Sequence, residues 1–248
     1  MRPADAAPLP ETPDPGVYDY VRLPLGGLEM VSACAFHPSG DYALVLEAYD
    51  RVHVLTWPAG EVTTITIDAP GRWFAFRDVV FTPDGSKALI VGVDDNDTGR
   101  IAAFDDAAYR AGEALPVSLL LERPGEALVA IEYPWDDGPP VVLGKQENGQ
   151  GWIARLRDLD VEAGAFGDFV EGFGSITGCD DFAFVNNEFG GPGIYVICGH
   201  NGADHRYYTW LGGVGEWRDR PGTNNTGNFV RIAAHRGGDY ALVLAAAG

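Results

Sequence analysis

Short apolar segments, separated by glycine and proline, recur along most of the chain. Residues 31–36 (VSACAF) and 128–131 (LVAI) are apolar at nearly every position, whereas residues 51–57 (RVHVLTW) and 61–67 (EVTTITI) alternate between apolar and polar side chains. Continuous apolar runs are typical of strands covered on both faces, and alternation is typical of strands with one face in water. The pattern predicts an all-β protein in which buried inner strands are flanked by half-exposed outer strands.

One short motif, a strand end followed by a glycine turn and a second strand, occurs several times. Residues 36–45 read FHPSGDYALV, residues 81–90 read FTPDGSKALI, and residues 234–243 read AHRGGDYALV, with two weaker copies between them. The spacings between successive turn glycines are 45, 53, 55 and 45 residues, which is the length of a four-stranded sheet with its turns. These five glycines are Gly40, Gly85, Gly138, Gly193 and Gly238.

The repeats resemble the blades of YVTN-type and WD-type β-propellers. The resemblance is closest over residues 79–91 (VVFTPDGSKALIV) and continues to residues 99–105 (GRIAAFD). In these families, a Phe-x-Pro-x-Gly segment ends the innermost strand of a blade and turns into the second strand. No Trp-Asp dipeptide ends a third strand here, which favours the YVTN-like type. The resemblance implies a propeller of about five blades, each of mostly four antiparallel strands, stacked around an axis.

The sequence divides into a leader and one domain. Residues 1–16 contain five prolines and no aromatic residue, so we expect a flexible leader, followed by a propeller domain over residues 17–248. The fifth repeat ends near its second strand, so a closed ring needs a further strand. We expect residues 17–23 (VYDYVRL) to pair beside the last hairpin and close the ring through both ends of the chain. The alternative is a part of a longer ring, with an exposed sheet edge.

The charge of the chain limits the partners that we expect. Asp and Glu number 36 against 17 Lys and Arg, which gives a formal net charge of −19. Affinity for nucleic acid comes from clustered Lys and Arg, so no nucleic-acid partner is predicted. No apolar stretch approaches the ~20 residues that span a bilayer, so no transmembrane segment is predicted. No secretory signal is visible, and both a cytoplasmic and an exported protein fit this sequence.

Candidate binding residues lie in segments that share one face of a propeller. The loops between second and third strands and the linkers between blades meet on that face, and such loops often carry function. We expect this acidic face, which includes aromatic side chains, to bind a protein or a small molecule. The candidates are Arg72, Trp73, Glu147, Asn148, His200, Asn201, Asp204 and His205. Zinc ligation by the two histidines with Asp204 is conceivable, and a polar hairpin tip is the alternative.

Residues 94–99 (DDNDTG) form the sharpest local motif. Asp94, Asn96, Thr98 and the following glycine match positions one, three, five and six of a calcium-binding loop. Asp105 falls at position twelve, where such loops carry a bidentate Glu. The motif predicts a calcium site made of these four oxygen-bearing side chains. A solvated hairpin turn is the alternative, because Asn-Asp-Thr-Gly also favours tight turns.

The chain has three cysteines, Cys34, Cys179 and Cys198, and no Cys-x-x-Cys motif. This spacing excludes a zinc ribbon and a thioredoxin-like site. Cys179 and Cys198 flank the fourth hairpin at nearly equal distance from its turn, so they could pair across it. Three buried thiols, which pack as small apolar groups, are the alternative.

Three classes of function fit these observations. We expect a non-catalytic binding scaffold, because no nucleophile elbow, P-loop or dinucleotide-binding motif is present. The resemblance to YVTN-type repeats implies, as an alternative, a lactonase-like hydrolase with a metal near the central channel. The third possibility is a structural part of a larger assembly that receives strands from a partner. Residues that would converge in the hydrolase are Glu47, Asp94, Glu147, Asn148 and Asn186.

Overall fold

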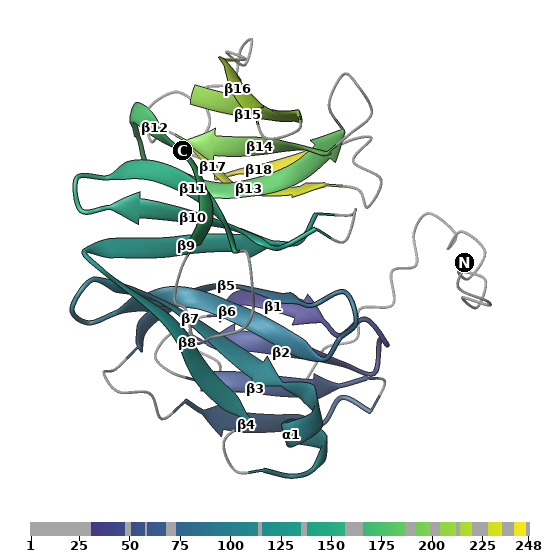
Figure 1. Ribbon diagram of the computed structural model, residues 1–248. Helices are drawn as coiled ribbons and strands as arrows, with labels where there is room; N and C mark the ends of the chain where they lie inside the picture. The colour runs from purple at the N-terminus through teal and green to yellow at the C-terminus, as the bar shows by residue number, and fades with distance from the viewer. Residues whose placement is uncertain are drawn as a thin grey trace, which may run out of the picture.

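The computed structural model is built almost entirely from antiparallel strands (Figure 1). It describes residues 31–47, 51–57, 59–67, 73–113, 116–134, 138–156, 166–186, 192–198, 204–211, 214–219, 228–234 and 241–246. Within these ranges one short helix, α1 (Asp106–Arg110), accompanies the strands, and no described helix is long or apolar enough to cross a membrane. The expected leader, residues 1–16, and the expected closing strand, residues 17–23, lie outside the described residues.

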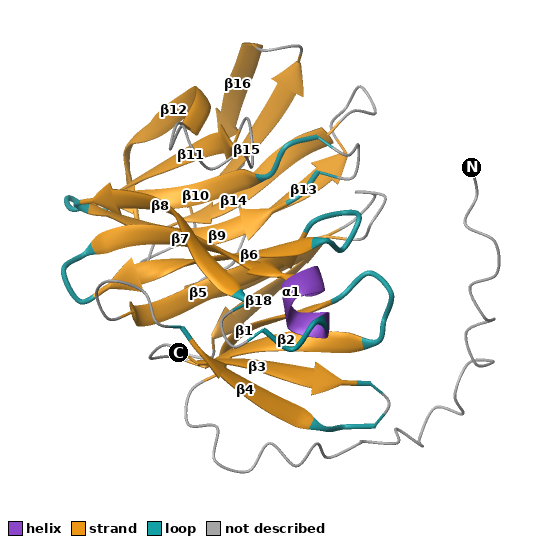
Figure 2. Cartoon of the chain, turned by 60° about the horizontal axis from the view of Figure 1, so that its bottom comes forward, coloured by secondary structure: helices purple, strands orange, loops and turns teal. Residues whose placement is uncertain are grey.

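The strands group into sequential units that match the predicted repeats (Figure 2). The first unit contains β1 (Val31–Phe36), β2 (Tyr42–Glu47), β3 (Arg51–Thr56) and β4 (Val62–Thr66). The second contains β5 (Trp73–Phe81), β6 (Lys87–Asp94), β7 (Thr98–Asp105) and β8 (Val117–Pro124). The third contains β9 (Glu126–Glu132), β10 (Val141–Gln146), β11 (Gln150–Leu156) and β12 (Phe166–Thr177).

The fourth unit contains β13 (Cys179–Asn186), β14 (Pro192–Cys198), β15 (Asp204–Leu211) and β16 (Val214–Asp219). The fifth is the hairpin of β17 (Asn228–Ala234) and β18 (Ala241–Ala246). A single parallel bridge between Thr98 and Glu126 joins the second and third units into one eight-stranded sheet. Within the described residues, β17 and β18 pair only with each other, so strand pairing does not close a ring.

The units stack face to face, and the core lies between neighbouring units. One buried cluster joins the first and second units through residues such as Leu44 and Phe76. A second joins the second and third units through Leu89 and Trp152, and a third joins the third and fourth units through residues such as Phe182. Successive residues of β6 therefore face opposite clusters, which explains why its sequence is a continuous apolar run.

Burial differs from the sequence expectation in two strands. β1 was predicted to be a buried inner strand, yet Val31 is 53% exposed and Phe36 is 62% exposed. β3 was predicted to alternate, yet four consecutive residues from Val52 to Leu55 are buried. Val52 and Val54 pack into the cluster between the first two units, whereas residues 31–34 of β1 line an open cavity.

Two of the predicted turn glycines are confirmed and one prediction is wrong. Gly40 and Gly85 adopt φ values of 78° and 74°, which a glycine adopts without steric cost. Gly193 does not lie in a turn, because it is inside β14, where it pairs with Val185 and Thr209. Gly138 precedes β10, and Gly238 lies outside the described residues.

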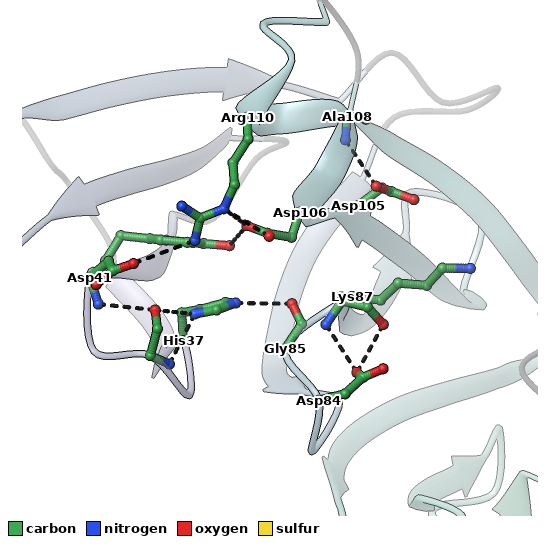
Figure 3. Close-up of polar contacts among 12 residues, drawn as sticks. His37, Asp41, Asp84, Gly85, Lys87, Asp105, Asp106, Ala108 and Arg110 are labelled. Carbon is green, nitrogen blue, oxygen red and sulfur yellow. Dashed lines mark hydrogen bonds and ion pairs between the residues drawn. The ribbon is translucent and has the colours of Figure 1, made fainter. Parts of the chain in front are cut away.

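The glycine turns of the first two units contact each other (Figure 3). The His37 ring nitrogen Nε2 lies 3.0 Å from the carbonyl oxygen of Gly85. The Tyr42 hydroxyl donates a hydrogen bond of 2.7 Å to Asp106 Oδ1, and Arg110 binds both oxygens of the same carboxylate. Buried histidine and tyrosine therefore hold adjacent units in register at this end of the inner strands.

Candidate functional site

A cavity of about 550 Å³ lies among the inner strands of all five units. Each unit contributes residues of its first strand to the cavity wall. The side chains that line the cavity are mainly apolar, and four of the five inner strands also contribute charged groups. The lining residues are 31–34 of β1, 77–80 of β5, Val129, Ile131 and Glu132 of β9, Asp181 and Phe182 of β13, and 231–234 of β17.

Charged side chains connect four pairs of neighbouring inner strands around this cavity. The N–H of Ile131 on β9 donates to Asp78 Oδ2 on β5 (2.9 Å), and the N–H of Phe184 on β13 donates to Glu132 Oε2 on β9 (3.3 Å). Backbone groups on the free edge of an inner strand need such partners, because no neighbouring strand pairs with that edge.

The same arrangement continues through the last unit. The N–H of Ile232 on β17 donates to Asp181 Oδ2 on β13 (2.9 Å). Arg231 Nη2 then donates to the carbonyl oxygen of Ser32 on β1 (3.3 Å). These four contacts, which we call the axial bridges, join β5 to β9, β9 to β13, β13 to β17 and β17 to β1.

The carboxyl groups of the axial bridges have unusual proton affinity. Burial raises the pKa of Glu132 to about 8, and the nearby charges of Asp78 and Asp181 add to that rise. Burial also raises the pKa of Asp78 to about 7, although the N–H of Ile131 opposes the shift. The pKa of Asp181 is raised for the same reason. Removing these carboxyl groups from bulk water disfavours their charged forms.

The predicted calcium ligands do not come together. Asp94 Oδ1 accepts the N–H groups of Asn96 (2.8 Å) and Thr98 (2.9 Å), and Asp94 Oδ2 lies 2.9 Å from the Arg100 guanidinium. The Asp94 carboxylate is therefore neutralised by an arginine and stabilised by a local turn. Asp105 is at the other end of β7, where it caps α1 by accepting the N–H of Ala108.

Packing explains the glycine of the calcium-like motif. A Cβ atom on Gly99 would collide with the carbonyl oxygen of Glu126 at the parallel bridge between β7 and β9. Glycine is needed there because two backbones approach closely, whether or not an ion is present. Among the described residues, no group of three His, Cys, Asp or Glu side chains is arranged to hold a metal ion.

Five of the eight predicted binding residues lie in the described part of the chain. Glu147 and Asn148 are exposed in the β10–β11 turn, where Asn148 Oδ1 accepts the N–H of Gln150. Asp204 and His205 are the first residues of β15 rather than loop residues, and Trp73 is the first residue of β5. Arg72, His200 and Asn201 lie outside the described residues.

The residues considered for a hydrolase do not converge on the cavity. Glu47 binds the ring of His53 on the neighbouring strand at 2.9 Å, and Asp94 binds Arg100. Glu147 and Asn148 are in an exposed turn, and Asn186 is the last residue of β13. None of the five is among the residues that line the cavity.

The cysteines differ in state. Cys34 has a free thiol on the cavity wall, and Cys179 is disulfide-bonded. The register of β13 and β14 places Cys198 directly opposite Cys179, and the chain has three cysteines, so Cys198 is the partner that this register favours.

Sequence reasoning missed the charged residues of the cavity, although a signal for them exists. Asp78 and Asp181 each stand three residues before a phenylalanine of an inner strand, in DVVF and DFAF. Arg231 stands three residues before Ala234, which occupies the same position of the repeat. A charged side chain inside an otherwise apolar strand, recurring at one repeat position, indicates a shared role.

The fold resembles that of a solved β-propeller domain. No family model matches the sequence, and no curated protein matches it either. A functionally unknown protein from Desulfotomaculum acetoxidans DSM 771 superimposes with a TM-score of 0.57 at 14% identity, over 88% of this chain and 63% of that chain. The β-propeller domain of Cps50 (Swd1) from Myceliophteria thermophila gives a TM-score of 0.53 at 12% identity, over 82% of this chain and 62% of that chain.

At these identities, the likeness concerns the fold alone. The chain matches little more than three fifths of the length of either structure. The sequential antiparallel units, the cores between them and the cavity at their axis agree with this comparison. The chain is an all-β protein with a propeller-like fold.

Proposed function

We propose that the chain is a non-catalytic β-propeller binding scaffold whose ligand site is the central cavity. The observation that supports this most strongly is the cavity itself, whose wall combines residues from all five units. Its volume of about 550 Å³ lies within the range of small-molecule sites. Apolar walls with a few convergent charged groups are also typical of such sites. Binding to the loop face that carries Glu147 and Asn148 stays a prediction.

A closed ring of about five blades is part of this proposal. Residues 17–23 would pair beside the β17–β18 hairpin and complete the fifth blade. A chain that begins at residue 24 is then expected to unfold at a lower temperature, whereas one that begins at residue 17 should match the full chain. Equal thermal stability of the two shortened chains would contradict this mode of closure.

Cys34 allows the location of the site to be tested. A small-molecule library is screened by ligand-observed NMR against the full chain before and after Cys34 reacts with a bulky maleimide. The matched control carries Cys34→Ser and Asn148→Cys, which moves the same adduct to an exposed turn. We expect ligands to be lost when the adduct is at Cys34 and retained when it is at position 148. Ligands that are retained in both proteins would overturn the central site.

A further inference from the structure

We infer that the central cavity binds a small organic monocation, with its ammonium group bound to Glu132 and stabilised by the nearby charges of Asp78 and Asp181. This inference rests on the proposed function and adds the chemical class of the ligand. It begins with the arrangement of the three carboxyl groups, which come from three successive inner strands and line the same cavity. Each carboxyl group is already fixed by an N–H from the following strand, so it is oriented before a ligand arrives.

Glu132 has a hydrogen-bonding position left for a ligand. Its Oε2 accepts the N–H of Phe184, and among the described residues its Oε1 has no hydrogen-bond partner. An ionised carboxylate can accept about four hydrogen bonds, and an ammonium group donates three. Asp78 and Asp181 each accept two backbone N–H groups, which leaves lone pairs on both side chains. The cavity therefore presents acceptors to a compact donor.

The charge balance of the wall indicates a single positive charge. Three carboxylates and two guanidinium groups, those of Arg77 and Arg231, line the cavity, which leaves a net charge of −1 when all are ionised. Arg231 donates to the backbone of Ser32, and the nearby Asp180 is paired with Lys145 at 2.7 Å. One monovalent cation would make the wall neutral, whereas a divalent ion would leave a buried excess charge.

The apolar part of the wall indicates an organic ligand. Val129, Ile131, Phe182 and Ile232 contribute to the same cavity. A hydrated metal ion would gain nothing from these side chains, whereas the hydrocarbon part of an amine would bury apolar surface against them.

Binding of the cation should release a proton. The raised pKa of Glu132, about 8, means that this group is mostly protonated in the empty cavity at neutral pH. A neighbouring ammonium group favours the ionised form, so the proton leaves as the amine binds. The exchange is balanced: one cation enters the cavity, and the proton of Glu132, with that of the protonated fraction of Asp78, goes to the solvent.

The test compares benzylamine, benzyl alcohol and benzoate by calorimetry at pH 7 in two buffers with different ionisation enthalpies. We expect benzylamine to bind at least ten times more tightly than benzyl alcohol, benzoate to bind more weakly than either, and the benzylamine heat to depend on the buffer. Glu132→Gln should reduce the buffer dependence, leaving only the part due to Asp78, and weaken benzylamine at least fivefold, with benzyl alcohol unchanged. Glu147→Gln, an exposed control, should change neither property.

Equal binding of benzylamine and benzyl alcohol would overturn the cation inference and leave a ligand site at the cavity intact. No binding of any of the three probes would also overturn it, and the library screen then decides the proposed function separately. If Glu132→Gln does not fold, the unmodified protein provides the readout: benzylamine should bind at least ten times more weakly at pH 5 than at pH 8. A pH-independent affinity would contradict the inference.

Discussion

Arg231 Nη2 lies 3.3 Å from the carbonyl oxygen of Ser32, and this hydrogen bond connects residues that are 199 positions apart. It joins the inner strand of the last unit to the inner strand of the first. With the contacts of Asp78, Glu132 and Asp181, it forms a series that links the inner strands from β5 through β9, β13 and β17 to β1. The axis of the molecule is therefore held by charged side chains as well as by the apolar clusters between units.

Replacement of Gly85 should be more costly than replacement of Gly40. Both glycines have a left-handed backbone, but a Cβ on Gly85 would lie 2.5 Å from His37 Nε2, whereas a Cβ on Gly40 meets nothing within 4 Å. We expect Gly40→Ala to cost about 1 kcal/mol from backbone strain and Gly85→Ala about 2–3 kcal/mol. Urea denaturation measures both. Equal costs would show that His37 does not pack against the second turn.

Loss of the Tyr42 hydroxyl should weaken the contact between the first two units. Tyr42 donates to Asp106, whereas the buried hydroxyl of Tyr133 has no hydrogen-bond partner among the described residues. We expect Tyr42→Phe to lower the free energy of unfolding by about 1–2 kcal/mol and Tyr133→Phe to change it by less than about 0.5 kcal/mol. A larger effect at Tyr133 than at Tyr42 in the same denaturation experiment would contradict the geometry.

The cavity carboxyl groups should make the protein less stable as the pH rises. Asp78 and Glu132 have pKa values of about 7 and 8 in the folded chain, against ordinary values of 3.8 and 4.5. At pH values between the unfolded and folded pKa values of these groups, the folded state therefore binds more protons than the unfolded state. The stability that these two groups contribute is complete below about pH 4 and is lost as the pH rises through about 7–8.

Glu132→Gln should flatten this dependence, because the amide does not titrate. We expect the variant to gain on the order of 2 kcal/mol relative to the unmodified chain between pH 5 and pH 9. Glu147→Gln removes the same charge at an exposed position and controls for the net charge of the chain. Thermal unfolding measured across this pH range tests the prediction. If stability depends on pH in the same way in the unmodified chain and in Glu132→Gln, the pKa of Glu132 is not raised.

Calcium should leave the melting temperature unchanged at millimolar concentration. Arg100 already neutralises Asp94, and Asp105 is engaged at the far end of β7. Asp94→Asn should nevertheless cost about 2–4 kcal/mol, because it leaves the buried Arg100 with less compensation. The neighbouring Asp97→Asn is the control. A calcium-dependent rise in melting temperature that Asp94→Asn abolishes would restore the metal site.

The repeat architecture could be predicted because local sequence patterns determine its turns and strands. Gly40 and Gly85 mark turns through their conformational freedom, and continuous apolar runs such as residues 88–91 mark strands covered on both faces. Gly193, which was predicted to lie in a turn, lies inside a strand, and this difference has a local cause too. Pro192 begins β14, and a proline at the first position of a strand does not interrupt the strand that follows.

The site could not be predicted in the same way because it depends on contacts between units. Asp78 and Ile131 are 53 residues apart in sequence, and Asp181 and Ile232 are 51 apart. Spacing along the chain gives no sign that these pairs meet. In the DDNDTG motif, by contrast, the sequence predicts a contact that the structure does not contain. Asp94 and Asp105 fit a metal-binding spacing, but the eight-residue strand β7 separates them.

The arrangement of the inner strands around one cavity is tested most directly by crosslinking across it. Cys34 on β1 and a cysteine introduced by Ala233→Cys on β17 both line the cavity, which is about 10 Å across if spherical. A short bismaleimide should join these two positions within one molecule, and mass spectrometry of the digested protein should identify the linked peptides. Asn148→Cys, which lies outside the cavity wall, should not be linked to Cys34. Absence of the crosslink between positions 34 and 233, with both thiols reactive toward a monofunctional maleimide, would contradict the arrangement.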